Sequence, residues 1–481
     1  MTIFEYLQAV SHAKDYPIYI FKDKEISVRE LYRYVLKTIN WLAYIGVRQG
    51  DRLLISMSNS LEFLCLTYAS SYIGCCLMPI NPSMSKTQVQ ELTDYLGASV
   101  LLTQEDFNLE RLSSFSTFNV ETKNLKNNLD LPFLISTTSG STSKPKPIVL
   151  SQKTKVKRAF RTAIELYSLN SNDIIVTSTP MFHTLGFRLS ILPVYIGAKG
   201  LILDSFDPDY WLYCVNKYGV TFAILVTNQI EAILDYVEGK NISLKNTPLR
   251  CIVSSSSSLK QDVRQRLLEA FTGEIHEIYG TSETASATDF DLRKHPDKLL
   301  SVGKPIQGVS IKILDNTYRE LKPFEVGEIA IKTDLIFSGY LDMPEETRKA
   351  FTEDGYFLTG DVGYLDEDGF LYFKGRKRFI YKVGGMNVFP EDIEKVLRQF
   401  PGITDCVVVG RQAGGLIGTE LVAFYTGRGN VKTSELRKFC MQRLAPYQVP
   451  VKFVQLDELP KNSVGKTDRR SLENMLNRGD V

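Results

Sequence analysis

TTSGSTSKPKP, at residues 137–147, is the stretch that decides how this chain is interpreted. It follows the apolar run LPFLIS at 131–136, so we expect a strand that ends in a loop rich in hydroxyl groups and flexible backbone. The backbone N–H groups and hydroxyls of such a loop can surround phosphate oxygens, and Lys146 adds a positive charge. The P-loop spacing GxxxxGK[ST] is absent, and by composition alone the stretch also fits a solvated linker.

Short apolar runs alternate with helical patterns on both sides of this loop. The run TFAILVTN at 221–228, for example, is followed by the helical pattern QIEAILDYVEG and then by the run RCIVSSS at 250–256. Such alternation predicts parallel strands joined by crossover helices. Residues 63–85 lack charges, but Gly74, Pro79 and polar side chains interrupt them. We therefore expect a buried helix that leads into a strand there, and no membrane span.

The pattern changes after about residue 300, where shorter strands are separated by Gly and Asp-Gly pairs, as in FTEDGYFLTGDVGYLDEDGFLYF at 351–373. These pairs predict tight turns between antiparallel strands. The last hundred or so residues read as a compact α+β unit, which is an ordinary domain size. The sequence thus predicts an α/β fold. We expect residues 1–375 to form a large N-terminal domain of doubly wound mixed sheets plus a small β-subdomain, and residues 376–481 to form a small C-terminal α+β domain.

Composition narrows the range of functions. The chain has 481 residues, 43% of them hydrophobic and 23% charged, which is typical of a folded globular protein. A net charge of +2 provides no field for gripping a nucleic-acid backbone, so we expect no nucleic-acid partner. The seven cysteines show neither CxxC nor zinc-ligand spacing, and the N-terminus shows no signal peptide. Reduced thiols and a cytoplasmic location are expected.

A resemblance decides how the loop is to be read. TSGSTSKPK resembles the phosphate loop TSGTTGxPK of the adenylate-forming superfamily, which includes acyl- and aryl-CoA synthetases, peptide-synthetase adenylation domains and beetle luciferases. Further signatures of that superfamily follow in its order and span the chain. They are PMFHTLGF at 180–187, EIYGTSE at 277–283, GEIAIKT at 327–333, FLTGDVG at 357–363, GRKRFIYKVGGMNVFPEDIE at 375–394 and PKNSVGKTDR at 460–469.

The resemblance implies a two-step reaction that requires ATP and Mg²⁺. A carboxylic acid is joined to AMP with release of pyrophosphate, and the acyl group then passes to a pantetheine thiol. Lys466 resembles the catalytic lysine that bridges the carboxylate and the α-phosphate, and Thr142 and Glu283 resemble the Mg²⁺ ligands. Asp361 and Arg376 resemble the contacts to the ribose hydroxyls. Without the motif order, each of these residues would read as an ordinary solvated side chain or turn residue.

The remaining binding residues follow from the same resemblance. Tyr279 and Gly280 would lie against adenine and AMP, and residues 376–385 would form the hinge about which the small, mobile domain rotates. Arg378 stands at the hinge position, where relatives usually carry Asp or Lys. Gly384 and Gly385 would let pantetheine approach the backbone. The full set of nucleotide- and pantetheine-binding residues is Thr138, Ser139, Gly140, Ser141, Thr142, Ser143, Lys146, Ser257, Glu277, Tyr279, Gly280, Thr281, Ser282, Asp361, Arg376, Arg378, Lys382, Gly384 and Gly385.

The chain departs from the superfamily pattern in two places that bear on the substrate. Ser143 and Pro147 replace glycines in the phosphate loop, and proline removes a backbone donor. Ser255 and Ser256 replace the two glycines of SGGAPL, so we expect a narrower or more polar acyl pocket, unless these side chains point into the sheet. His183 stands where amino-acid-activating domains have an Asp. We assign it as a catalytic gate residue at the acyl or pantetheine tunnel, although a half-buried strand-end histidine is an alternative.

The favoured function is an acyl- or aryl-CoA ligase that acts on a small carboxylic acid. The alternatives are a stand-alone enzyme that loads a separate acyl carrier protein, a luciferase-like oxygenase, and a non-catalytic nucleotide-binding relative. CoA and a carrier-protein arm present the same phosphopantetheine thiol, so the sequence does not separate these two acceptors.

Overall fold

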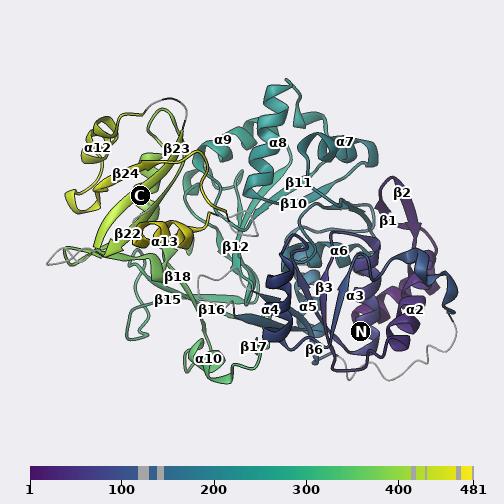
Figure 1. Cartoon of the computed structure of the whole chain (residues 1–481). Helices are drawn as coiled ribbons and strands as arrows, with labels where there is room; N and C mark the ends of the chain where they lie inside the picture. Colours follow the sequence, from purple (N-terminus) through teal and green to yellow (C-terminus); the bar gives the residue numbers. More distant parts are fainter. Residues whose placement is uncertain are drawn as a thin grey trace. The chain divides into compact units, whose positions relative to one another are not determined.

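The structure is a computed structural model that describes residues 1–117, 129–137, 146–412, 419–427, 429, 431–461 and 467–478. The chain forms two compact units (Figure 1). The first comprises the described residues of Met1–Thr138, Pro145–Ser310 and Lys332–Phe351, and the second comprises those of Ile311–Ile331 and Thr352–Val481. The domain boundary predicted after residue 375 falls within the second unit and stays a prediction. The α/β class with mixed sheets is confirmed.

A nine-stranded mixed sheet organises the first unit. Its strands, in spatial order, are β14 (Lys304–Pro305), β13 (Ala285–Asp291), β12 (Glu274–Thr281), β11 (Cys251–Ser255), β10 (Phe222–Val226), β8 (Ile174–Thr177), β9 (Lys199–Ile202), β1 (Pro17–Phe21) and β2 (Lys24–Ser27). Strands β10, β11 and β12 run parallel, with helix α8 (Thr227–Gly239) crossing between β10 and β11 as predicted. Beyond β12 the chain turns back into antiparallel β13, so this turn lies at the carboxyl edge of the parallel strands.

A six-stranded sheet carries the start of the candidate phosphate loop. Its strands, in spatial order, are β17 (Gly339–Tyr340), β7 (Pro147–Ser151), β6 (Pro132–Thr137), β4 (Cys76–Ile80), β3 (Arg52–Ser56) and β5 (Val100–Thr103). The strand predicted before the loop is β6, and it pairs antiparallel with β7. The buried helix predicted ahead of a strand is α3 (Leu61–Ile73), which is buried around most of its circumference and leads into β4.

Helices fill the space between these sheets and cover their outer faces. Helix α5 (Gln152–Phe160) contacts the six-stranded sheet, α6 (Thr184–Ile196) contacts the nine-stranded sheet, and the two helices contact each other. The other helices of this unit are α1 (Ile3–Ala13), α2 (Val28–Tyr44), α4 (Lys86–Leu96), α7 (Pro208–Tyr218), α9 (Gln261–Ala270) and α10 (Pro344–Lys349). Among the helices of the described residues, none combines the length and the apolar character that a membrane crossing requires.

One buried amide, that of Asn59, ties the two sheets together. It lies between β3 and α3, and its Nδ2 donates to the carbonyl of Thr179 at 3.2 Å and to that of Leu203 at 2.9 Å. Its Oδ1 accepts from the Met181 N–H at 2.6 Å. Thr179 and Leu203 follow strands β8 and β9, so a single side chain joins the connection after β3 to the end of the other sheet.

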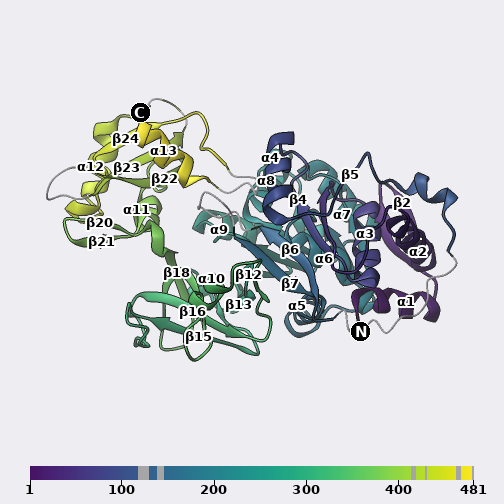
Figure 2. The same ribbon diagram turned by 60° about the horizontal axis from the view of Figure 1, so that its bottom comes forward.

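The second unit has antiparallel and α+β parts. A four-stranded sheet contains β15 (Val309–Leu314), β16 (Gly327–Thr333), β18 (Phe357–Leu365) and β19 (Leu371–Arg376), and an Asp-Gly turn joins β18 to β19 as predicted. A three-stranded sheet follows, with helix α13 (Arg469–Arg478) against β22 (Figure 2). The remaining elements are the hairpin β20 (Tyr381–Val383) and β21 (Met386–Val388), strands β22 (Ile403–Gln412), β23 (Thr419–Gly427) and β24 (Lys452–Gln455), and helices α11 (Pro390–Leu397) and α12 (Thr433–Met441).

Replacing Asn59 by alanine should destabilise the first unit by about 3 kcal/mol or more, because three buried backbone groups each lose a partner at about 1–3 kcal/mol. Urea unfolding with a fluorescence readout measures the loss. Asn216→Ala is the control, since exposed Asn216 donates to the carbonyl of Leu212 within its own helix, and it should change stability by less than about 1 kcal/mol. Equal midpoints for the two variants would contradict the role given to Asn59.

Candidate functional site

The candidate site of the first unit is built at the carboxyl edge of β11 and β12. Parallel strands end at a common edge, and ligands of open α/β sheets bind there. The serine-rich loop follows β11, and the turn that carries Ser282 and Glu283 follows β12. Pairing of Ser254 with Glu277 fixes the register of the two strands and hence the relative height of both loops.

Arg158, a buried residue of α5, holds the turn after β12 in place. Its guanidinium donates to the carbonyl of Ser282 at 2.9 Å, to that of Glu283 at 2.6 Å, and twice to that of Leu335 at 2.9 and 2.7 Å. Burial, and to a smaller extent Arg188, lowers the pKa of Arg158 to about 9, so the guanidinium stays protonated near neutral pH. Arg158 therefore fixes the backbone on which Glu283 stands.

Tyr340 links Glu283 to Lys146. Glu283 is the predicted metal ligand, and Lys146 is the predicted phosphate-binding cation. The Tyr340 hydroxyl donates to Glu283 Oε1 at 3.2 Å, and Lys146 Nζ lies 5.0 Å from the centre of the Tyr340 ring. Lys146 also pairs with Glu346 at 2.9 Å. Burial and the neighbouring Glu283 carboxylate raise the pKa of Tyr340, which keeps its hydroxyl a hydrogen-bond donor. A carboxylate, a phenol and an ammonium group thus form one network.

Two of the predicted nucleotide-binding positions are engaged in holding the serine-rich loop. Glu277 is buried and pairs with Arg264 at 2.6 Å, and its other oxygen accepts from the Leu259 N–H at 3.3 Å. Burial raises the pKa of Glu277, and Arg264 opposes that rise. Ser257 exchanges hydrogen bonds with Thr227 at the start of α8, at 2.9 Å each. In this structure both residues position the loop.

Ser256 adopts a backbone conformation that favours glycine. Its φ is +82°, which costs a residue with a side chain about 1–2 kcal/mol. Ser256 is exposed and Ser255 is half-buried. At position 256 the glycine of the superfamily pattern therefore matches a backbone requirement as well as a requirement for space.

Gly280 marks a close approach between β12 and β13. A Cβ built on Gly280 would lie 1.8 Å from the carbonyl oxygen of Ala285, so no side chain fits. Thr281 caps the following turn through reciprocal bonds with Thr284, each 3.2 Å long. Tyr279 precedes this turn and is half-buried. The YGTSE signature thus encodes one tight turn that displays Glu283.

His183 is the N-cap residue of α6 and is half-buried. Its ring centre lies 4.4 Å from that of Phe182. Behind it, the buried Lys155 of α5 donates to the Thr184 carbonyl at 3.3 Å and lies 4.6 Å from the centre of the Phe187 ring. Burial, Arg158 and Arg188 lower the pKa of Lys155 well below its usual value. The start of α6 is therefore packed against a buried cluster of basic residues.

In the second unit Asp361 and Arg376, the two residues predicted to contact the ribose, form an ion pair with each other. Asp361 and Arg376 face each other on β18 and β19, and Arg376 Nε lies 2.8 Å from Asp361 Oδ1. Asp361 is buried, whereas 45% of the Arg376 side chain is exposed. Glu328 of GEIAIKT supports this segment, since it accepts from the Gly360 N–H at 3.2 Å and pairs with Lys377 at 2.6 Å.

The predicted pantetheine glycines form the turn of the β20–β21 hairpin. Gly384 and Gly385 have φ values of +56° and +84°, as a two-residue turn of this kind requires. Lys382 is exposed on β20, and Arg378 lies in the short helical turn Lys377–Phe379 with its guanidinium 4.6 Å from the centre of the Phe379 ring. The hairpin exposes the glycine backbone.

Several predicted residues lie outside the described part of the chain. They are the phosphate-loop residues Thr138, Ser139, Gly140, Ser141, Thr142 and Ser143, and Lys466. Their neighbours are described: Lys461 and Thr467 form an antiparallel bridge. Arg469, which follows the lysine motif, pairs with Glu391 at 3.0 Å and with Glu394 at 2.8 Å.

Sequence reasoning did not identify Arg158, Tyr340 or Glu328. Arg158 belongs to QKTKVKRAF, which reads as a solvated basic helix, and its burial depends on carbonyl groups far away in the sequence. Tyr340 lies in no quoted signature. Glu328 lies within GEIAIKT, and the order of the signatures could have singled it out.

Comparison with known proteins places the chain in a family. A family model described as AMP-binding enzyme matches residues 7–341, and one described as AMP-binding enzyme C-terminal domain matches residues 392–466. A 2-succinylbenzoate–CoA ligase from Bacillus cereus is 28% identical over 467 residues, which cover 95% of both chains.

Solved structures show the same fold. An o-succinylbenzoate CoA synthetase from Bacillus subtilis, in complex with an acyl-adenylate, has a TM-score of 0.88 at 24% identity over 98% of this chain and 97% of that one. ATP-bound MatB from Rhodopseudomonas palustris has a TM-score of 0.85 at 23% identity over 99% of both chains. The protein therefore belongs to the AMP-binding enzyme family and is an ATP-dependent, AMP-forming acid–thiol ligase.

Proposed function

We propose that this ligase acts on a compact aromatic acid of the 2-succinylbenzoate type and that free CoA accepts the acyl group. The main support for this proposal is the 28% identity to a 2-succinylbenzoate–CoA ligase over 95% of both chains. The network of Lys146, Tyr340 and Glu283 supports it, because residues suited to phosphate and metal are joined in this chain. CoA is favoured over a carrier protein because the relatives are named as CoA ligases. The cytoplasmic location stays a prediction.

The reaction assigns a task to each group. A carboxylate oxygen attacks the α-phosphorus and pyrophosphate leaves, after which the CoA thiolate attacks the acyl carbon and AMP leaves. Lys466 would stabilise the charge that develops in the first step. Asp361 would accept from the ribose hydroxyls, and Arg376 would provide their cationic contact. Lys146 and the loop at 138–143 would contact the phosphates.

Glu283 fits the Mg²⁺ that ATP chemistry requires. Its carboxylate offers the hard oxygen ligands that Mg²⁺ prefers, and Thr142 is the second proposed ligand. When bound, Mg²⁺ would neutralise charge on the triphosphate. Arg158 and Tyr340 hold the backbone and one carboxylate oxygen of Glu283, so both act as positioning residues.

The direct test incubates the enzyme with ATP, Mg²⁺, CoA and 2-succinylbenzoate, and follows the thioester by mass spectrometry. A phosphopantetheinylated carrier protein in place of CoA forms the second arm. We expect the products to be the CoA thioester of 2-succinylbenzoate and AMP. Turnover with the carrier alone, or with long-chain acids but not 2-succinylbenzoate, would contradict it.

Lys466→Ala should abolish adenylate formation and spare the thioester step from synthetic acyl-AMP. The lysine would contact charge that develops only in the first half-reaction, so its loss should cost about 3–5 kcal/mol. Acid-dependent ATP–pyrophosphate exchange measures the first step, and thioester formation from acyl-AMP measures the second. Normal exchange in the variant would show that Lys466 is not the catalytic lysine.

Tyr340→Phe should raise the Mg²⁺ concentration needed for half-maximal pyrophosphate exchange by about three- to tenfold. The variant removes only the hydroxyl bonded to Glu283, and such a bond contributes about 1 kcal/mol. Tyr236→Phe is the matched control, since it removes a hydroxyl bonded to Asp209 on the surface. Superimposable Mg²⁺ curves for the two variants would exclude the positioning role.

The acyl pocket should favour compact acids over palmitate. If Ser255 and Ser256 intrude on the pocket, as their positions in the superfamily pattern imply, overpacking costs about 1–3 kcal/mol, which is one to two decades in kcat/KM. A series of acids of increasing length, tested on the wild type and on the double variant S255G/S256G, measures this. The variant should accept longer acids, and Ser256→Gly alone should stabilise the fold because φ is +82° there. An unaltered length profile would mean that the serines do not shape the pocket.

A further inference from the structure

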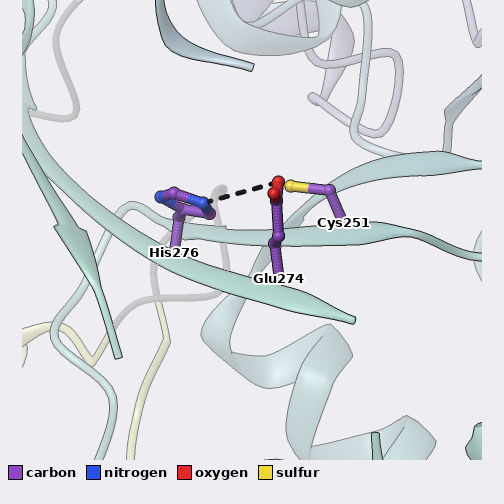
Figure 3. A group of neighbouring side chains, drawn as sticks. All are labelled: Cys251, Glu274 and His276. Atoms are coloured by element: carbon purple, nitrogen blue, oxygen red, sulfur yellow. Dashed lines mark ion pairs between the residues drawn. The ribbon is translucent and has the colours of Figure 1, made fainter. Parts of the chain in front are cut away.

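A second cluster of ligand-type side chains lies at the opposite edge of the same strands. Cys251 is the first residue of β11 and Glu274 the first residue of β12, and the two are register partners. His276 lies two residues further along β12, so its side chain projects from the same face as that of Glu274. Figure 3 shows the three side chains directed toward one another from adjacent strands.

The spacing of these side chains suits a metal ion. One ligand atom from each of Cys251, Glu274 and His276 lies within 4.8 Å of the other two. Ligand atoms around a tetrahedral Zn²⁺ lie about 3.3–3.8 Å apart, as bonds of about 2.0–2.3 Å require. Cys251 and His276 are buried, whereas the Glu274 side chain is 55% exposed, so its carboxylate is free to turn toward an ion and close the remaining gap.

Hydrogen bonds orient the imidazole for coordination. Asp289 Oδ2 lies 2.8 Å from His276 Nδ1, and Asp289 Oδ1 accepts from the Tyr167 hydroxyl at 3.0 Å. When Nδ1 donates to Asp289, Nε2 presents its lone pair toward Glu274 Oε2, which lies 3.9 Å away. Two acceptors and a thiol then face one another, an arrangement that a cation stabilises. A carboxylate behind the histidine is the usual support of metal-binding imidazoles.

The surrounding charges also favour a cation. The carboxylates of Glu274 and Asp289 lie on either side of His276. The two nearby cations each have a carboxylate partner of their own, since Arg250 bonds to Asp173 at 2.8 Å and Lys294 to Asp291 at 2.9 Å, and the charge of each also reaches Glu274. A thiolate, an imidazole and a carboxylate select Zn²⁺ over Mg²⁺ or Ca²⁺.

We propose that Cys251, Glu274 and His276 form a binding site for one Zn²⁺ ion, with water as the fourth ligand. The ion would join the amino ends of β11 and β12 and stabilise their pairing. The site lies at the other end of these strands from the serine-rich loop and Glu283. Zinc therefore stabilises the fold and takes no part in the acid–thiol ligase reaction.

The test uses the full-length protein after treatment with a chelator. Zn²⁺ is titrated against a chromophoric competitor, and Co²⁺ replaces it in a parallel absorption measurement. We expect one equivalent of Zn²⁺, a higher melting temperature with Zn²⁺ than with Mg²⁺, and a thiolate-to-cobalt charge-transfer band with tetrahedral d–d bands. Binding of less than about a tenth of an equivalent, or a cobalt spectrum without the thiolate band, would overturn the proposal.

Variants separate coordination from folding. Glu274→Gln should weaken Zn²⁺ binding by about tenfold or more while the melting temperature without zinc stays the same, because Glu274 is exposed. Cys251→Ser should remove the charge-transfer band. Glu269→Gln, at an exposed position of α9, and Cys214→Ser, at a buried thiol of α7, are the controls and should bind as the wild type does. Unchanged affinity in both Glu274→Gln and Cys251→Ser would refute the site.

Discussion

The candidate site of the first unit depends on the guanidinium of Arg158. It is buried, and it gives four hydrogen bonds to the carbonyls of Ser282, Glu283 and Leu335, which come from segments far apart in the sequence. A buried cation is costly unless its donors are satisfied, so these segments are held where the carbonyls meet the guanidinium. The Glu283 carbonyl also accepts from the Phe337 N–H at 2.8 Å, which brings in the chain that leads to Tyr340. The network that reaches Lys146 rests on this arrangement.

Much of the fold could be predicted from periodicity alone. The βαβ step of β10, α8 and β11, the buried helix α3 and the turn between β18 and β19 follow from apolar spacing and Asp-Gly pairs. These features depend on neighbours in sequence. Arg158 and Tyr340 could not be predicted, because their roles come from partners more than a hundred and about sixty residues away, respectively. The roles given to Lys466 and to the loop at 138–143 come from the resemblance, because these residues lie outside the described part of the chain.

The structure also changes how two motif positions are understood. Glu277 belongs to the EIYGTSE signature, whose resemblance implies nucleotide binding, yet its carboxylate is occupied by Arg264 and by the Leu259 N–H. Its described contacts hold the end of the serine-rich loop against β12. The side chain of Ser256 adds volume to the candidate acyl pocket, yet the φ of +82° at this residue shows that the backbone conformation usual for glycine persists without the glycine. A motif letter can therefore encode backbone geometry as much as contact with a ligand.

The pairing of β11 with β12 couples the structure at the amino ends of these two strands to the structure at their carboxyl ends. The register that sets Cys251 opposite Glu274 also sets Ser254 opposite Glu277, because successive pairs of a parallel ladder are not independent. A slip of one residue would turn the side chains of one strand to the other face, and would break the Arg264–Glu277 pair and the cysteine–glutamate–histidine cluster together. Spacing in the sequence could not reveal this cluster, since its ligands come from two strands that only the sheet brings together. Whatever strengthens the ladder at its amino end also holds in place the loops at its carboxyl end, which carry Ser256, Glu283 and the other residues of the candidate site.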